Sequence, residues 1–121
     1  MDAVDVPNPF AWSAKFDVGN AKMNDEHKGL FAGIDDCCKN PGDGGKLDAL
    51  KGKVAAHFAS EEAAMTGKGL LDGGHKGTHD EFLTTAGGLA CPLSADTGTF
   101  MKKWLVHHIL DSDIPSYGGK L

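Results

Sequence analysis

Histidines and carboxylates recur along this chain at intervals that place them on common helix faces. His57 and Glu61 are four residues apart, as are His75 and His79, and this spacing puts both members of each pair on one face. The candidate metal ligands are His27, His57, Glu61, His75, His79, His108 and Asp113. So many imidazoles and carboxylates directed at one interior indicate a transition-metal centre that holds more than one ion.

Each candidate has an ordinary explanation when it is taken alone. A single histidine such as His27 is more often a core or surface residue than a ligand, and His57 with Glu61 could form a surface ion pair. His75 and His79 are more specific, because two histidines one turn apart form a bidentate clamp for a metal. The conjunction favours a metal site, since the candidates share faces with apolar residues and a buried Glu61 carboxylate is costly without a cation.

The last histidines of the chain leave a choice that spacing does not settle. His107 and Asp111 are four residues apart and share a helix face, whereas His108 and Asp113 are five apart and share one less well. Neighbouring residues point about 100° apart on a helix, so His107 and His108 do not both face inward. The position of His108, four residues after Trp104 on the apolar stripe, favours His108.

The composition is that of a single soluble domain. The chain has 121 residues, of which 24% are charged and 40% hydrophobic, and its net charge of -5 gives no reason to expect a nucleic-acid partner. No apolar run approaches the roughly 20 residues that span a membrane. The acidic N-terminus lacks the apolar region of a secretory signal, so we expect a cytoplasmic protein. Cys37, Cys38 and Cys91 are an odd number in a chain without a secretory signal, so we expect reduced thiols and not disulfides. No Cys-x-x-Cys spacing exists, which disfavours a thiolate metal site.

Apolar residues repeat at helical spacing in four segments, at about 20–39, 46–66, 72–88 and 96–110, with Asp96 or Thr97 as N-cap of the fourth. Glycine- and proline-rich turns separate these segments, and Pro115 is expected to stop any helix beyond them. Short connections predict an all-α, antiparallel up-down-up-down four-helix bundle over residues 20–111. Residues 1–19 are expected to form an extended arm that packs through Phe10, Trp12 and Phe16, and residues 112–121 a C-terminal tail.

Seventeen glycines are many for a helical chain. Gly29, Gly33, Gly52 and Gly87 fall inside the expected helices, where each costs about 1 kcal/mol relative to alanine. Tertiary packing and metal binding must therefore supply stability that helix propensity does not.

Taken together, these motifs resemble the hemerythrin and myohemerythrin family along essentially the whole chain. The ligand series reads His, His-x-x-x-Glu, His-x-x-x-His and His-x-x-x-x-Asp, a combination that is highly specific. The matching segments are Pro7–Trp12, Asp25–Lys28, His57–Glu62, His75–His79, Trp104–Ile109 with Asp113, and Gly119–Leu121. The resemblance implies one hemerythrin-like domain over residues 1–121, and it favours His108 and Asp113 over His107 and Asp111.

What the resemblance implies is a centre of two non-haem irons with a bridging oxo or hydroxo ligand. By position, His75, His79 and His108 would hold one iron, and His27 and His57 the other. Glu61 and Asp113 would bridge both. Two octahedral irons then keep one open position, on the two-histidine iron, where the family binds dioxygen reversibly as a hydroperoxide, for storage or transport. The expected pocket walls are Leu30, Phe31, Phe58, Trp104 and Leu105.

No residue is placed as a general acid or base, so we expect a carrier and not an enzyme. Alternatives are an oxygen- or redox-sensing di-iron module and a metal-storage or detoxification protein. A ferritin-like oxidase is disfavoured because the chain lacks Glu-x-x-His motifs. Two departures from the family matter: Asn24 stands where aspartate is common, and Tyr117 follows Asp113 by four residues instead of three. A monomer and a homo-oligomer are both compatible with the sequence.

Overall fold

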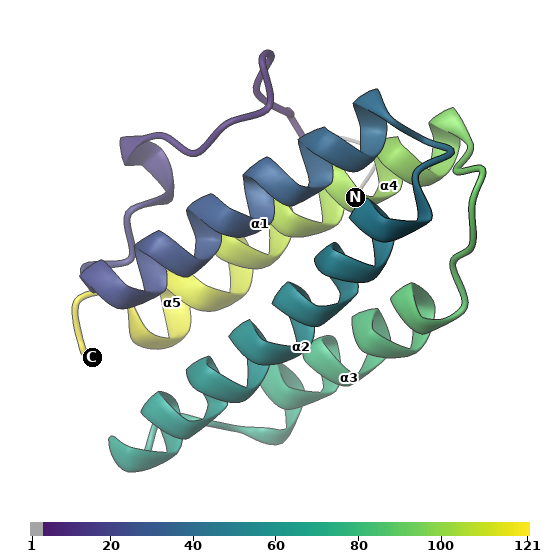
Figure 1. The fold of residues 1–121 in the computed structure, drawn as a ribbon. Coiled ribbons are helices and arrows are strands. Elements are labelled where there is room, and N and C mark those ends of the chain that lie inside the picture. The colour runs from purple at the N-terminus through teal and green to yellow at the C-terminus, as the bar shows by residue number, and fades with distance from the viewer. Residues whose placement is uncertain (1–3) are drawn as a thin grey trace.

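Four long helices run alternately up and down and pack side by side (Figure 1). The computed structural model describes residues 4–121, and those residues contain no β-strand. The long helices are α1 (Ala21–Lys39), α2 (Gly44–Gly67), α3 (Gly73–Gly87) and α4 (Ala95–His108). The predicted all-α four-helix bundle is therefore confirmed. Within residues 4–121, no helix is both long and apolar enough to cross a membrane.

Each long helix begins at a side chain that caps its first turn. The side-chain oxygens of the four N-caps accept hydrogen bonds from backbone N–H groups that the helix leaves unpaired. These N-caps are Asn20, Asp43, Asp72 and Ser94. For the fourth helix the prediction of Asp96 or Thr97 was wrong. Ser94 Oγ accepts from the N–H of Thr97 at 3.1 Å, so the helix begins earlier.

The prediction that the fourth helix ends near Leu110 was also wrong. A π-helical turn, η2 (Ile109–Asp113), continues α4 directly into the short helix α5 (Ile114–Tyr117). The N–H of Ile114 donates to the carbonyl of Ile109, five residues earlier. Pro115 lies in the first turn of α5, so the expectation that it stops any further helix was wrong. Part of the expected C-terminal tail is thus helical.

The N-terminal segment packs along α1, as its aromatic residues indicated (Figure 1). The rings of Phe10 and Phe16 have their centroids 4.7 and 4.9 Å from that of Phe31. One short 3-10 turn, η1 (Ala14–Phe16), interrupts the extended backbone. Asn24 joins this arm to α1, because its side chain accepts from the N–H of Val18 and donates to Asp17. Residues 1–3 of the expected arm lie outside the described residues.

Candidate metal centre

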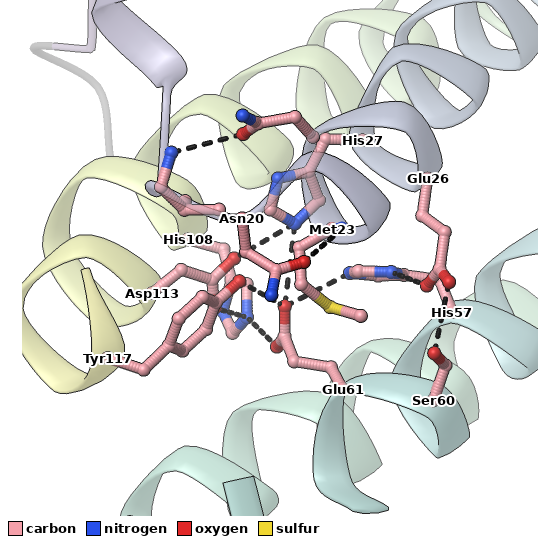
Figure 2. A network of polar contacts seen from close by, with 12 residues as sticks. Asn20, Met23, Glu26, His27, His57, Ser60, Glu61, His108, Asp113 and Tyr117 are labelled. Carbon is pink, nitrogen blue, oxygen red and sulfur yellow. Dashed lines mark hydrogen bonds and ion pairs between the residues drawn. The ribbon is translucent and has the colours of Figure 1, made fainter. Parts of the chain in front are cut away.

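The predicted ligands meet in the interior of the bundle, at the level where α1, α2, α3 and the end of α4 face one another. None of the seven side chains is more than 4% exposed. Figure 2 shows His27, Glu61, His108 and Asp113 directed toward one another. His107 is outside this cluster, half-exposed and paired through Nε2 with Asp111 at 3.1 Å. The structure therefore places His108, and not His107, among the other candidates.

The donor atoms fall into two groups that share Glu61. One group joins Glu61, His75, His79, His108 and Asp113, and the other joins His27, His57 and Glu61. Within each group the donor atoms lie within 4.8 Å of one another, the reach of one ion's coordination shell. The division matches the three-histidine and two-histidine sets that the resemblance implies.

Glu61 turns one carboxylate oxygen to each group. Its Oε1 lies 2.9 Å from His79 Nε2 and 3.2 Å from His75 Nε2. Its Oε2 lies 3.2 Å from His57 Nε2 and 3.4 Å from His27 Nε2. This arrangement suits a carboxylate that bridges two cations.

Asp113 reaches both groups because of the π turn that precedes it. A π turn bonds residues five apart, so it stacks Asp113 over His108 on one face. Asp113 Oδ1 lies 3.0 Å from the Nε2 atoms of His75 and His108. Its Oδ2 lies 3.3 Å from His27 Nε2, in the two-histidine group. The five-residue spacing that looked unfavourable on a regular helix is thus the one that this backbone uses.

The chain is similar to known proteins along nearly its whole length. No family model matches the chain. Individual relatives do match: the myohemerythrin of Theromyzon tessulatum is 37% identical, over 97% of this chain and 98% of the relative. Myohemerythrin-1 of Phascolopsis gouldii is 39% identical over the same shares. A hemerythrin-like protein of Naegleria gruberi is 38% identical over 96% and 98%. The chain belongs to the hemerythrin family.

Two further glutamates fix the orientation of candidate ligand histidines. His57 Nδ1 lies 2.7 Å from Glu26, and His79 Nδ1 lies 2.9 Å from Glu62. A carboxylate accepts hydrogen bonds, so each Nδ1 donates outward to its glutamate and each Nε2 is turned toward the cluster. Sequence reasoning missed both glutamates, although each sits next to a ligand in the chain.

Three hydroxyl groups complete this outer layer of contacts. Ser116 Oγ lies 3.2 Å from His75 Nδ1, and Thr78 Oγ1 lies 3.3 Å from His108 Nδ1. The Tyr117 hydroxyl donates to Glu61 Oε2 at 2.7 Å. Tyr117 reaches the site because α5 continues the helix, which places it one α-turn beyond Asp113. The sequence does carry a signal for this contact, since Tyr117 lies four residues after Asp113. The spacing is informative only when the helix is known to continue past Pro115.

Several contacts in the cluster are unfavourable without a cation between them. The Nε2 atoms of His79 and His108 both point into the cluster and lie 3.1 Å apart. His27 Nε2 and both Asp113 oxygens are buried without a well-aligned hydrogen-bond partner among the described residues. Buried polar atoms rarely lack a hydrogen-bond partner. Imidazole and carboxylate donors are ligands of iron, so the residues fit a pair of iron ions.

Electrostatics within the cluster is dominated by its two carboxylates. Burial opposes charge on His27 and His75, but contact with Asp113 and Glu61 outweighs burial and raises both pKa values to about 9. Burial alone would raise the pKa of Asp113, yet contacts with His108, His27 and His75 hold it at about 2. Cations that bind here must therefore compete with protons for the histidines.

The same carboxylates disfavour the charged form of Tyr117, because that form is an anion. Burial raises the pKa of its phenol, and the nearby Asp113 and Glu61 carboxylates raise it further. The hydroxyl therefore stays protonated and acts as a hydrogen-bond donor to Glu61.

Aromatic rings cover the three-histidine group. Phe58 stacks on His79 with centroids 4.0 Å apart, and Trp104 stacks on His108 at 4.6 Å. Leu30 and Leu105 are buried in the same core, whereas the ring of Phe31 meets the aromatic residues of the arm. Of the five expected pocket walls, Phe58 and Trp104 are thus the ones with ring contacts to ligand histidines.

Proposed function

We propose that this protein binds dioxygen reversibly, for storage or transport, at a non-haem di-iron centre. The observation that carries the proposal is the division of the seven buried donors into two groups that share Glu61. Relatives called myohemerythrin support it, since they match nearly the whole chain.

In this proposal the histidines hold two irons unequally. His75, His79 and His108 would hold one iron and His27 and His57 the other, together with a bridging oxo or hydroxo ligand. Glu61 and Asp113 bridge both irons, as the positions of their oxygens favour. When bound, the iron pair would supply the electrons for reversible dioxygen binding. The iron held by two histidines would keep one coordination position for dioxygen.

The protein's own part is to position these ligands and to keep water away. Glu26 and Glu62 orient two of the histidines, and neutral Tyr117 holds Glu61 by a hydrogen bond. An apolar surrounding excludes the protons and water that would release peroxide and leave the irons oxidised. We assign that wall to Leu30, Phe31, Phe58, Trp104 and Leu105. Relatives called myohemerythrin support a carrier and not an enzyme. Free cysteines support a cytoplasmic location.

Cycling between oxygen and argon tests this function. Protein loaded with iron and reduced without oxygen should gain a visible charge-transfer band under oxygen. The band should leave under argon, and it should return over many cycles with one dioxygen taken up per iron pair. A spectrum that moves once to an oxidised form and stays there would contradict the carrier and favour a redox sensor.

A further inference from the structure

An apolar recess opens on the surface between α1 and α2, directly outside His57. Its volume is about 310 Å³, and it is lined by Glu26, Gly29, Lys53, Ala56 and His57. Most of the surface it exposes is apolar. His57 is only 3% exposed, so its ring forms the inner wall between this recess and the ligand cluster.

Gly29 keeps the recess open. A Cβ built on Gly29 meets no other atom within 4 Å, whereas one on Gly33, a turn later, comes within 3.1 Å of the Leu50 side chain. Close packing of α1 on α2 therefore explains glycine at 33 but not at 29. A glycine inside a helix costs about 1 kcal/mol relative to alanine. The absence of a side chain at Gly29 leaves open space beside His57. Ala56, which lines the recess from α2, is also small.

A second depression lies on the other side of the molecule, between α3 and α4. It is larger, about 720 Å³, and Gly77, Trp104 and His108 are among its lining residues. It reaches the three-histidine group, where the ring of Trp104 is stacked on His108. The recess at Gly29 instead reaches His57, in the group with fewer protein donors.

We propose that the recess at Gly29 admits dioxygen to the two-histidine side of the centre, and that the missing side chain at position 29 sets its width. This inference rests on the proposed function. Dioxygen is small and apolar, as the recess is, and it passes inward beside the His57 ring, which stays held by Glu26. No bond forms or breaks in the recess, so its width controls rates of binding and release but not the equilibrium.

Xenon locates the recess without reference to oxygen binding. Xenon is an apolar probe that occupies dry cavities in proteins. Crystals of the iron-loaded protein, pressurised with xenon, should show a xenon atom between Gly29 and Ala56. Gly29→Leu should remove that atom, and Gly77→Leu should leave it in place. A recess that takes no xenon in the wild-type crystal overturns the proposal.

Stopped-flow mixing with dioxygen then measures the route itself. Gly29→Leu should slow association and dissociation by the same factor, roughly tenfold, and leave the affinity unchanged. Gly29→Ala should lie near the wild type. Ala56→Leu narrows the recess from α2 and should repeat the slowing, which keeps the test valid if Gly29→Leu folds poorly. Gly77→Leu, the matched control on the α3–α4 side, should bind at the wild-type rate.

The opposite pattern overturns the inference. Wild-type rates in both Gly29→Leu and Ala56→Leu exclude the recess as the route, and slowing in Gly77→Leu alone assigns access to the α3–α4 side. A wild-type protein that never binds dioxygen reversibly refutes the proposed function and the route together. In that case the xenon experiment still reports separately whether the recess takes an apolar molecule.

Discussion

Single atoms account for the asymmetry of the candidate centre. The two oxygens of Glu61 face different histidine groups, and one of them also accepts the hydrogen bond of Tyr117. Glu26 and Glu62 hold two imidazoles with Nε2 turned inward. Each of these contacts is buried or partly buried, so removing one partner leaves the other with an unmet polar atom.

Removing the Tyr117 hydroxyl should destabilise the protein. Tyr117→Phe deletes the 2.7 Å hydrogen bond to the buried Glu61 carboxylate. We expect the free energy of unfolding of the iron-loaded protein to fall by about 1–3 kcal/mol, measured by urea denaturation. Thr84→Val removes an exposed hydroxyl from α3 and should change stability by less than about 0.5 kcal/mol. Equal effects of the two substitutions would deny Tyr117 its role.

The two adjacent histidines at the end of α4 should differ sharply in metal binding. His108 lies among the other donors, whereas His107 pairs with Asp111 at the surface. His108→Asn should lower the iron content from about two ions per chain toward one, because the three-histidine group loses a ligand. His107→Asn should keep both ions. Iron per chain, measured by elemental analysis, checks this, and loss of iron from His107→Asn alone would reverse the assignment.

The π turn is the element that makes the centre possible. It places Asp113 and Tyr117 on the inner face, and a regular helix from His108 onward would rotate both away. The bundle and most of the candidate ligands could be predicted from sequence, because apolar residues and histidines repeat with the period of a helix. Asp113 was expected over Asp111 only from the family resemblance. The π turn could not be predicted, since no residue from Ile109 to Asp113 has a local preference for it. The reach of Tyr117 was unpredictable as well, because it depends on the same turn.

The orienting residues were unpredictable for a related reason. Glu26, Glu62, Thr78 and Ser116 meet their histidines across helices, with partners 17 to 41 residues away in the chain. Periodicity describes one helix at a time and carries no information about which face of the next helix it meets. The early start of α4 at Ser94 was missed because several residues nearby could serve equally well as caps.

The contact between α1 and α4 should make Gly98 behave differently from an exposed helical glycine. A Cβ at Gly98 would lie 2.9 Å from Cys38 Sγ, whereas one at Gly52 meets nothing within 4 Å. Gly52→Ala should raise the free energy of unfolding by about 1 kcal/mol. The free energy of unfolding of Gly98→Ala should be about 1–3 kcal/mol lower than the same gain would give, because the added methyl group overpacks the contact with Cys38.

A double substitution identifies the cause of that shortfall. Gly98→Ala combined with Cys38→Ala should recover most of the missing stability, since the clashing sulfur is gone. Thermal or urea unfolding of the four proteins in the cycle measures the coupling. A coupling of zero between positions 38 and 98 would show that the two helices do not meet there.

At the scale of the whole molecule, metal binding and folding are linked. The interior holds two carboxylates and five histidines in place of apolar core, and many helical positions are glycine. Ions that bind the folded chain and not the unfolded one stabilise it by mass action. The bundle therefore depends on its metal more than a bundle with an apolar interior does.

Removing the metal should lower the melting temperature substantially. Loss of at least about 3 kcal/mol corresponds to roughly 10 °C for a domain of this size. Calorimetry of the iron-loaded protein and of the same protein after chelation measures the difference. His107→Asn should show the full shift, while His108→Asn should show a smaller one. Identical melting with and without metal would mean that the interior cluster is stable by itself.

Anomalous diffraction at the iron edge, from crystals of the iron-loaded protein, tests the central claim most directly. We predict two iron peaks inside the bundle, one among His75, His79 and His108 and the other beside His27 and His57, with Glu61 and Asp113 between them. A single peak, or two peaks that do not share Glu61, would contradict the account of the centre.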